Sequence, residues 1–537
     1  MRRSRKPPSF SRDATRERRD MLSGDLLTTA TPPRDVALPS AAPPPIAMRR
    51  IGRDTLVYAA GILINRAAAF VLLPIYTHYL SPADYAVIQL VQMTLDFIAI
   101  LAGAKLAIGV FRYFHAAKTE EERRAVAGTS LLLICGAYAV VSLGVSVFAA
   151  PLSTLVFGNP SRASLIRLAA VGLVGQSLFI VPLALARASG RSFVFVAANT
   201  VLLLLQIALN LVLLVHYRLG PAAMFLSNAI ASMAVGAVLT IQVIRRIGLP
   251  YSGVAARRLV RYGLPLVATQ IATFISTFGD RYVLSQHTDL TTVGLYTLAY
   301  QFGFLLAMVG SMPVDLVWEP IRFSLAERSD RDFVLSRAFV YLNLLLITVA
   351  LAITLFTDAV LRVMTTPAFF PAATLVPVIL VAYILQSWTG MHDLGIHLRE
   401  RTEYITMANW VAAVVAIIGY LLLIPRWLGL GAAVATVLAF AVRYVIVWRV
   451  SLKLFPVRYD WTPVVRLVGL AVGAALLGLA TARFGIATSL ALRTALFGAY
   501  LLAAWSAGIL TAGERGAVRA FISERLSRRH PGVVPVA

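Results

Sequence analysis

Polar side chains follow one face of an apolar segment in the middle of the chain. Within residues 263–284, Thr269, Thr273, Ser276 and Asp280 stand at i, i+4, i+7 and i+11, a spacing that places them on one face of an α-helix. Arg281 follows directly. A lone polar group that faces lipid is costly, so a stripe of them indicates a face that is wet or buried.

Two other apolar segments carry ionisable residues. Gln89, Gln92 and Asp96 are spaced i, i+3 and i+7 within residues 85–108, and Asn65 precedes Arg66 within residues 54–76. At 1.5 Å per residue, Arg66 is about 18 Å into its segment, and an Arg near the bilayer centre costs about 2.5–3.5 kcal/mol on insertion scales. Asp96 is near the middle of its segment and is a plausible counter-ion or proton-carrying acid.

Each of these patterns has a structural alternative. Hydroxyls and amides also join neighbouring membrane helices by hydrogen bonds, and this alternative stays open for Asn199, Gln206 and Asn210 in residues 192–216. Arg281 is close to the end of its segment, where a long side chain can extend to the membrane surface. For residues 54–76, 85–108 and 263–284, we favour a water-filled cavity because ionisable groups accompany the polar ones.

Motifs of the common enzyme and metal sites are missing from the sequence. It contains no His-Glu-x-x-His, no phosphate-binding Gly-x-x-x-x-Gly-Lys-Ser/Thr and no Asp-rich cluster. The single cysteine, Cys135, lies in an apolar run and can form neither a disulfide framework nor a cysteine zinc site. We therefore expect no catalytic residues, no metal and no cofactor, and the protein is not expected to be an enzyme.

Composition places these segments in a membrane. Of 537 residues, 59% are hydrophobic and 14% are charged, and the mean hydropathy is +0.78, whereas soluble domains carry about 25% charged residues. We predict an all-α polytopic membrane protein with about fourteen spans of about 20 apolar residues each. The predicted spans are 54–76, 85–108, 126–149, 164–186, 192–216, 222–244, 263–284, 292–316, 335–357, 371–391, 406–424, 429–450, 463–482 and 490–511.

The distribution of positive charge predicts the orientation. With a cytoplasmic N-terminus, 38 of the 49 Lys and Arg residues fall in cytoplasmic segments and adjoining span ends, 7 fall on the opposite side and 4 lie within spans. Because Lys and Arg collect on the cytoplasmic side, both termini are predicted to be cytoplasmic. The net charge of +24 is spread over many short loops, so a nucleic-acid partner is not expected.

A weak internal repeat organises the spans. Leu219-Gly220 recurs as Leu428-Gly429 at an offset of about 209 residues. At a similar offset, Tyr85-Ala86 corresponds to Val293-Gly294-Leu295-Tyr296. Spans one to six would then repeat as seven to twelve in the same orientation, giving two six-helix lobes around a central cavity plus two extra C-terminal helices. The predicted parts are a basic arm or mis-assigned start at 1–47, an N-lobe at 48–250, a C-lobe at 251–455, the extra helices at 456–512 and a cytoplasmic tail at 513–537.

Several sequence fragments resemble one known family. The chain is similar, over residues 48–512, to the polysaccharide-transporter (O-antigen flippase) branch of the multidrug/oligosaccharidyl-lipid/polysaccharide exporter superfamily, although Ala86 stands where that family usually has Gly. The fragments that carry the resemblance are Asn65-Arg66, Tyr79-Leu80-Ser81-Pro82-Ala83-Asp84-Tyr85, Gly279-Asp280-Arg281-Tyr282, Val293-Gly294-Leu295-Tyr296, Arg401-Thr402, Ile424-Pro425-Arg426 and Gly431-Ala432-Ala433.

This resemblance implies a flippase of the bacterial inner membrane that moves an undecaprenyl-diphosphate-linked oligosaccharide from the cytoplasmic to the periplasmic leaflet. Membrane lipids and polysaccharide-assembly proteins such as a polymerase are the implied partners. Asp96 or Asp280 would couple an ion or proton gradient. The predicted substrate-binding residues are Asn65, Arg66, Gln89, Gln92, Thr269, Thr273, Ser276 and Arg281. The alternatives are an exporter of the peptidoglycan lipid precursor or of a drug, or a polytopic polysaccharide-polymerising enzyme. The short outer loops disfavour the enzyme, and the arginines favour an anionic cargo.

Overall fold

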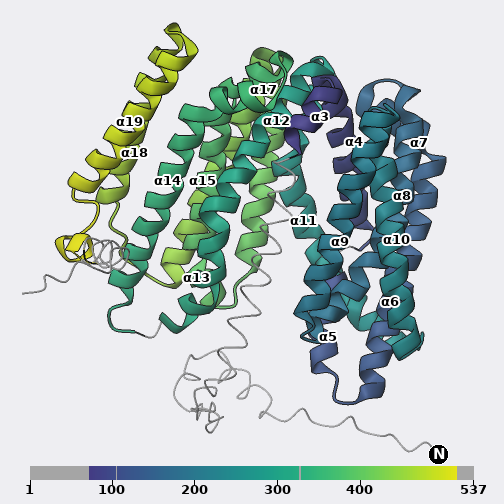
Figure 1. The fold of residues 1–537 in the computed structure, drawn as a ribbon. Helices are drawn as coiled ribbons and strands as arrows, with labels where there is room; N and C mark the ends of the chain where they lie inside the picture. Colours follow the sequence, from purple (N-terminus) through teal and green to yellow (C-terminus); the bar gives the residue numbers. More distant parts are fainter. Residues whose placement is uncertain (1–71, 104–105, 326–327, 517–519, 521–537) are drawn as a thin grey trace, which may run out of the picture. The chain divides into compact units, whose positions relative to one another are not determined.

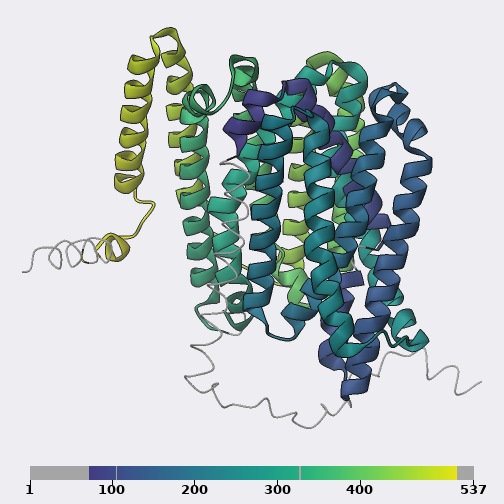
Figure 2. The same ribbon diagram turned by 45° about the vertical axis from the view of Figure 1, so that its right-hand side comes forward.

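The computed structural model describes residues 72–103, 106–325, 328–516 and 520, and these residues form helices and no strand. All of them belong to one unit of the chain. Eleven of their helices, or twelve with a bent pair counted as one span, are long and apolar enough to cross a membrane. The all-α polytopic fold class is thereby confirmed (Figures 1 and 2). The count of fourteen stays a prediction, because most of the first span lies outside the described residues.

The first helix group contains α4 to α10, preceded by α3. Its α4 begins where the sequence supplies a capping box: Ser81 accepts the backbone N–H of Asp84, Asp84 accepts that of Ser81, and Pro82 occupies the first turn. The bounds are α3 Leu73–Tyr79, α4 Pro82–Leu101, α5 Leu106–Ala116, α6 Glu120–Val147, α7 Ala149–Phe157, α8 Ala163–Ala188, α9 Ser192–Leu211 with a π turn to His216, and α10 Pro221–Ile247.

The predicted span 85–108 is wrong at its C-terminal end. The helix α4 stops at Leu101, and the separate helix α5 starts at Leu106, in a region expected to become a loop. Gly103 has a φ of 94°, a conformation that few residues other than glycine adopt. The apolar run therefore continues across a break in the helix, which hydropathy alone does not reveal.

A single long helix, α11, runs from Gly253 to His287 and is longer than its predicted span. Its 35 residues correspond to about 52 Å of helix, well beyond the roughly 30 Å of a bilayer core. Its first part packs on α5 and α6, where Arg112 stacks over the ring of Tyr262, and its later part packs along α17. The helix therefore contacts helices from both halves of the chain.

The second helix group follows α11. Its bounds are α12 Leu290–Leu306 with a π turn to Ser311, α13 Met312–Leu325, α14 Arg331–Met364, a 3-10 helix Pro367–Thr374, α15 Val376–His392, α16 Leu394–Leu398 and α17 Glu403–Leu454. The 3-10 helix and the helical segment that follows it meet at 51°. This bend lies at the two prolines, Pro371 and Pro377, that interrupt the predicted span 371–391.

The helix α17 is two spans that meet at a turn. Leu428 has a φ of 48° and a ψ of −126°, so the helical geometry breaks there. Tyr420 lies before the break and contacts Thr436 after it, with 3.2 Å between their oxygens, so the chain folds back on itself. The break falls between the predicted spans 406–424 and 429–450. In the first half, the corresponding turn contains Gly220, with a φ of 56°, which is 208 residues before Leu428 and so within one residue of the offset of the predicted repeat.

Two C-terminal helices complete the described structure, α18 (Thr462–Ala480) and α19 (Ile486–Ser506). They pack on each other and on α14 (Figure 1). Beyond α19, Glu514 accepts hydrogen bonds from Arg337 and Tyr341 of α14, which fixes the start of the tail against that helix. The predicted N-terminal arm at residues 1–47, and most of the predicted tail, lie outside the described residues.

The two helix groups contact each other at the end of the bundle where α3 lies, here called the α3 end. Thr77 of α3 donates to the carbonyl of Met364 at 3.2 Å, and Gln301 of α12 donates to Tyr85 of α4 at 3.1 Å. A Cβ added to Gly294 of α12 would lie 1.9 Å from the Pro82 carbonyl oxygen, so α4 and α12 touch backbone to backbone. The opposite end, where α5 lies, is called the α5 end. The lobe boundaries at 250 and 455 stay a prediction.

Candidate functional site

The polar face of α11 packs against α17. Thr269 is 3.1 Å from Thr406 between side-chain oxygens, and the backbone carbonyl of Ser276 accepts the hydroxyl of Tyr420 at 3.0 Å. Ser276 is fully buried, whereas Thr269 and Thr273 are half-buried. The expectation that this face lines a water-filled cavity is therefore wrong for Ser276 in this conformation, because Ser276 is buried and its hydroxyl donates to the carbonyls of Ala272 and Thr273 in its own helix. Of the three hydroxyls, that of Thr269 contacts α17.

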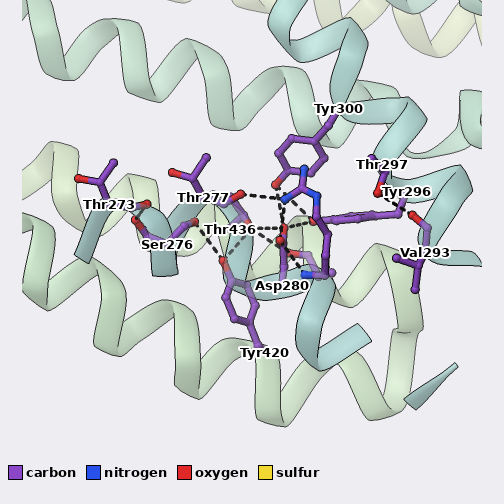
Figure 3. A network of polar contacts seen from close by, with 12 residues as sticks. Thr273, Ser276, Thr277, Asp280, Val293, Tyr296, Thr297, Tyr300, Tyr420 and Thr436 are labelled. Carbon is purple, nitrogen blue, oxygen red and sulfur yellow. Dashed lines mark hydrogen bonds and ion pairs between the residues drawn. The ribbon is translucent and has the colours of Figure 1, made fainter. Parts of the chain in front are cut away.

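Asp280 is the centre of a buried polar cluster (Figure 3). Its carboxylate is completely inaccessible to solvent and accepts the Arg281 guanidinium at 2.7 Å, together with the Arg281 backbone N–H at 2.9 Å. Its second oxygen accepts the hydroxyls of Tyr296, Tyr300 and Thr436. Five donors therefore surround one carboxylate, which leaves little room for a cation to coordinate to it.

Arg281 is also fully buried, at 1% exposure, so it does not extend to the membrane surface as one alternative proposed. Its guanidinium carbon lies 3.9 Å from the centroid of the Tyr300 ring, and its Nη1 donates to the carbonyl of Thr277 at 2.8 Å. Its Nε and Nη2 are buried and make no hydrogen bond among the described residues. Two buried donors that lack acceptors are unfavourable.

Tyr300, Tyr420 and Thr436 of this cluster are not among the residues that the sequence predicts for the site. They come from α12 and from both halves of α17. Tyr296 was singled out in the sequence only as part of the fragment Val293-Gly294-Leu295-Tyr296. The i, i+4 spacing of Tyr296 and Tyr300 was the available signal, because it places two hydroxyls on one helix face.

Gln89, Gln92 and Asp96 lie on α4 and make no hydrogen bond to Asp280 or Arg281. The amide of Gln92 donates to the Asp96 carboxylate at 3.0 Å. Asp96 is exposed at the protein surface, and Gln89 and Gln92 are half-buried. The hydrogen bond of 2.9 Å between Thr94 and Tyr282 connects α4 to α11 one residue beyond Arg281.

A cavity of about 470 Å³ lies inside the first helix group. It is bordered by α4, α5, α8, α9 and α10. Of the predicted site residues that the structure describes, Gln92 lines it and the others do not. Sequence analysis places the transport cavity between the two lobes, so this cavity differs from the predicted one. Asn65 and Arg66 lie outside the described residues. Among the residues that the structure describes, no group of three or more His, Cys, Asp or Glu side chains could hold a metal ion.

The helices, the folded-back α17 and the buried charges define a multi-pass membrane protein with a transporter fold. Among solved structures, the chain is similar to lipid II flippase MurJ in an inward closed conformation, with a TM-score of 0.68 and 12% identity over 83% of this chain and 98% of that one. It is also similar to a multidrug resistance MATE family transporter of the MOP superfamily. The inward-facing form matches with a TM-score of 0.57 and 15% identity, over 74% of this chain and 97% of that one. The outward-facing form matches with a TM-score of 0.50 and 16% identity, over 75% of this chain and 95% of that one.

A family model described as polysaccharide biosynthesis protein matches residues 51–326, which is more than half of the chain. The protein therefore belongs to this family, as the fragments in the sequence indicated. No curated protein matches it by sequence. The solved neighbours are a flippase and transporters, not enzymes.

Proposed function

We propose that the protein flips an undecaprenyl-diphosphate-linked oligosaccharide from the cytoplasmic to the periplasmic leaflet of the bacterial inner membrane by alternating access. The observation that supports this most is the closed α3 end, where Thr77, Tyr85 and Gly294 join the two helix groups. Under the predicted topology this end is periplasmic. The conformation is then one that receives cargo from the cytoplasmic side.

The charge of the α5 end supports an anionic cargo. In the first helix group and the start of α11, this end carries eleven basic residues among those described but three acidic ones, Glu120, Glu121 and Glu122. The basic residues are Arg112, Lys118, Arg123, Arg124, Arg187, Arg191, Arg245, Arg246, Arg257, Arg258 and Arg261. Such a basic surface attracts a diphosphate, because guanidinium groups offer paired donors to phosphate oxygens. On this proposal, the cargo is a unit of lipopolysaccharide or of another surface polymer. A polymerase that joins such units is then a partner of the protein.

The first test concerns Arg66, whose role rests on the sequence. We expect Arg66→Ala to lower flipping at least tenfold in reconstituted vesicles, because a central Arg that costs about 2.5–3.5 kcal/mol on insertion needs a function to be retained. The assay follows fluorescent lipid-linked oligosaccharide from one leaflet to the other. Arg426→Ala is the control, because Arg426 is exposed. Equal rates for both variants and the wild type would contradict the role.

The second test concerns Asp96 as the coupling acid. Because all oxygens of Asp280 are occupied, Asp96, which has one hydrogen bond from Gln92, is the better candidate of the two. We expect Asp96→Asn to abolish the stimulation of flipping by an imposed proton or sodium gradient, and to leave the slow rate without a gradient within about twofold. Gradient-dependent flipping by the Asn variant would exclude this residue.

A further inference from the structure

The cavity within the first helix group is long and narrow. One face of α8 runs along it, from Ala169 to Arg187, a separation of about 27 Å. The other walls are α4, α5, α9 and α10. Its volume of about 470 Å³ lies within the range of small-molecule sites, and none of the functions proposed above uses it.

Three carboxamides line the middle of this cavity: Gln92 of α4, Gln176 of α8 and Asn228 of α10. Asn228 accepts a hydrogen bond from Gln206 at 2.9 Å, which leaves its amide N–H₂ available as a donor. Gln176 makes no hydrogen bond to any of the described residues and is half-buried. Amides offer both donors and acceptors, so this set suits a ligand with hydroxyl groups better than a hydrocarbon chain.

Most of the remaining lining is apolar, with aliphatic and aromatic side chains, and it includes one arginine. Phe179, Phe195 and Phe225 border the cavity, and Arg187 lies at its α5 end, with its guanidinium 5.7 Å from the centroid of the Phe195 ring. Arg187 is exposed. The cavity therefore has an uncharged middle, in which three amides stand among apolar side chains, and a cationic group at the end that the topology prediction places in the cytoplasm.

Close packing of α8 against α10 holds the Asn228 amide in position. A Cβ added to Gly175 would lie 2.3 Å from the Ser232 hydroxyl, and one added to Gly172 would lie 3.0 Å from the Asn228 amide nitrogen. The helices α8 and α10 therefore approach closely along the cavity wall. A side chain held in this way loses little conformational freedom when a ligand binds.

We propose that this cavity binds a sugar residue of the cargo, with Gln176 and Asn228 hydrogen-bonded to its hydroxyls and Arg187 paired with the diphosphate. The proposal rests on the proposed function and specifies where the headgroup is held. Gln92 lines the same cavity and donates to Asp96. The amide oxygen of Gln92 is therefore left to accept a sugar hydroxyl.

The experiment compares two probes, undecaprenyl diphosphate and undecaprenyl diphosphate bearing one hexose, bound to the purified protein in nanodiscs. We expect the wild type to bind the hexose-bearing probe about tenfold more tightly. Gln176→Leu should remove this preference and leave the affinity for the bare probe unchanged, since the variant deletes hydrogen bonds to the sugar alone. Arg187→Ala should weaken both probes by a similar factor.

Gln242→Leu is the matched control, because Gln242 is an exposed glutamine on α10 outside the cavity. A preference retained by both Gln176→Leu and Asn228→Leu, or equal binding of the two probes by the wild type, overturns the sugar site while leaving a lipid-diphosphate flippase intact. Failure of the wild type to bind either probe overturns the proposed function and the sugar site together.

Discussion

Replacing Gly294 by valine is expected to prevent closure of the α3 end and to abolish flipping. An added Cβ would lie 1.9 Å from the Pro82 carbonyl oxygen and 2.6 Å from its carbon. Both are backbone atoms that cannot turn aside, so α4 and α12 must separate. Because alternating access needs this end to close once in each cycle, we expect the rate to fall at least a hundredfold.

The opening can be measured separately from transport. In a Cys135→Ala background, a cysteine at position 77 should react slowly with an impermeant thiol reagent, because Thr77 is 2% exposed, and much faster when Gly294→Val is added. Gly469→Val of α18 is the control, since a Cβ at Gly469 would meet nothing within 4 Å and the cost in helix propensity is similar. Slow labelling together with wild-type flipping in Gly294→Val would contradict the closed contact.

Replacing Asp280 by alanine is expected to destabilise the protein by about 3–5 kcal/mol, the usual cost of leaving a buried charge without its partner. The Arg281 guanidinium would lose its ion pair, and the hydroxyls of Tyr296 and Tyr300 would lose their shared acceptor. The measurement is the Tm of the purified protein in detergent. Asp330→Ala is the control, because its pair with Arg328 is exposed and such pairs contribute little.

Two further variants separate stability from function at this cluster. The double variant Asp280→Asn, Arg281→Gln removes both charges and should recover most of the lost Tm, because no charge is left unpaired. If Arg281 also binds cargo, the double variant stays inactive although it is folded, and Arg281→Lys, which lacks the paired donors, is inactive as well. Recovery of flipping in the double variant would show that the pair is structural only.

Much of the fold could be predicted from the sequence because membrane spans are specified locally. About 20 apolar residues are needed for each span, so runs such as 192–216 could be located without knowledge of their neighbours. The turn at Leu428 was predictable because the repeat carries the same dipeptide at Gly220. The break between α4 and α5 was not, because the apolar composition continues through it.

The site was predicted only in part, because its partners come from distant segments. The face of Thr269, Ser276 and Asp280 was visible in the spacing of one helix, but the helix it faces was not. That Tyr300 and Thr436 would meet Asp280 depends on how α12 and α17 pack. The cavity around Gln176 needs five helices, and no local pattern of the sequence indicates it.

The length of α11 has a mechanical consequence. Because its first part packs on α5 and α6 and its later part on α17, this one helix connects the two helix groups. Pro265 lies between these attachments, and proline removes a backbone hydrogen bond from the helix interior. We therefore expect α11 to bend at this residue when the two helix groups move relative to each other. Pro265 would then be a hinge that transmits movement from one membrane face to the other.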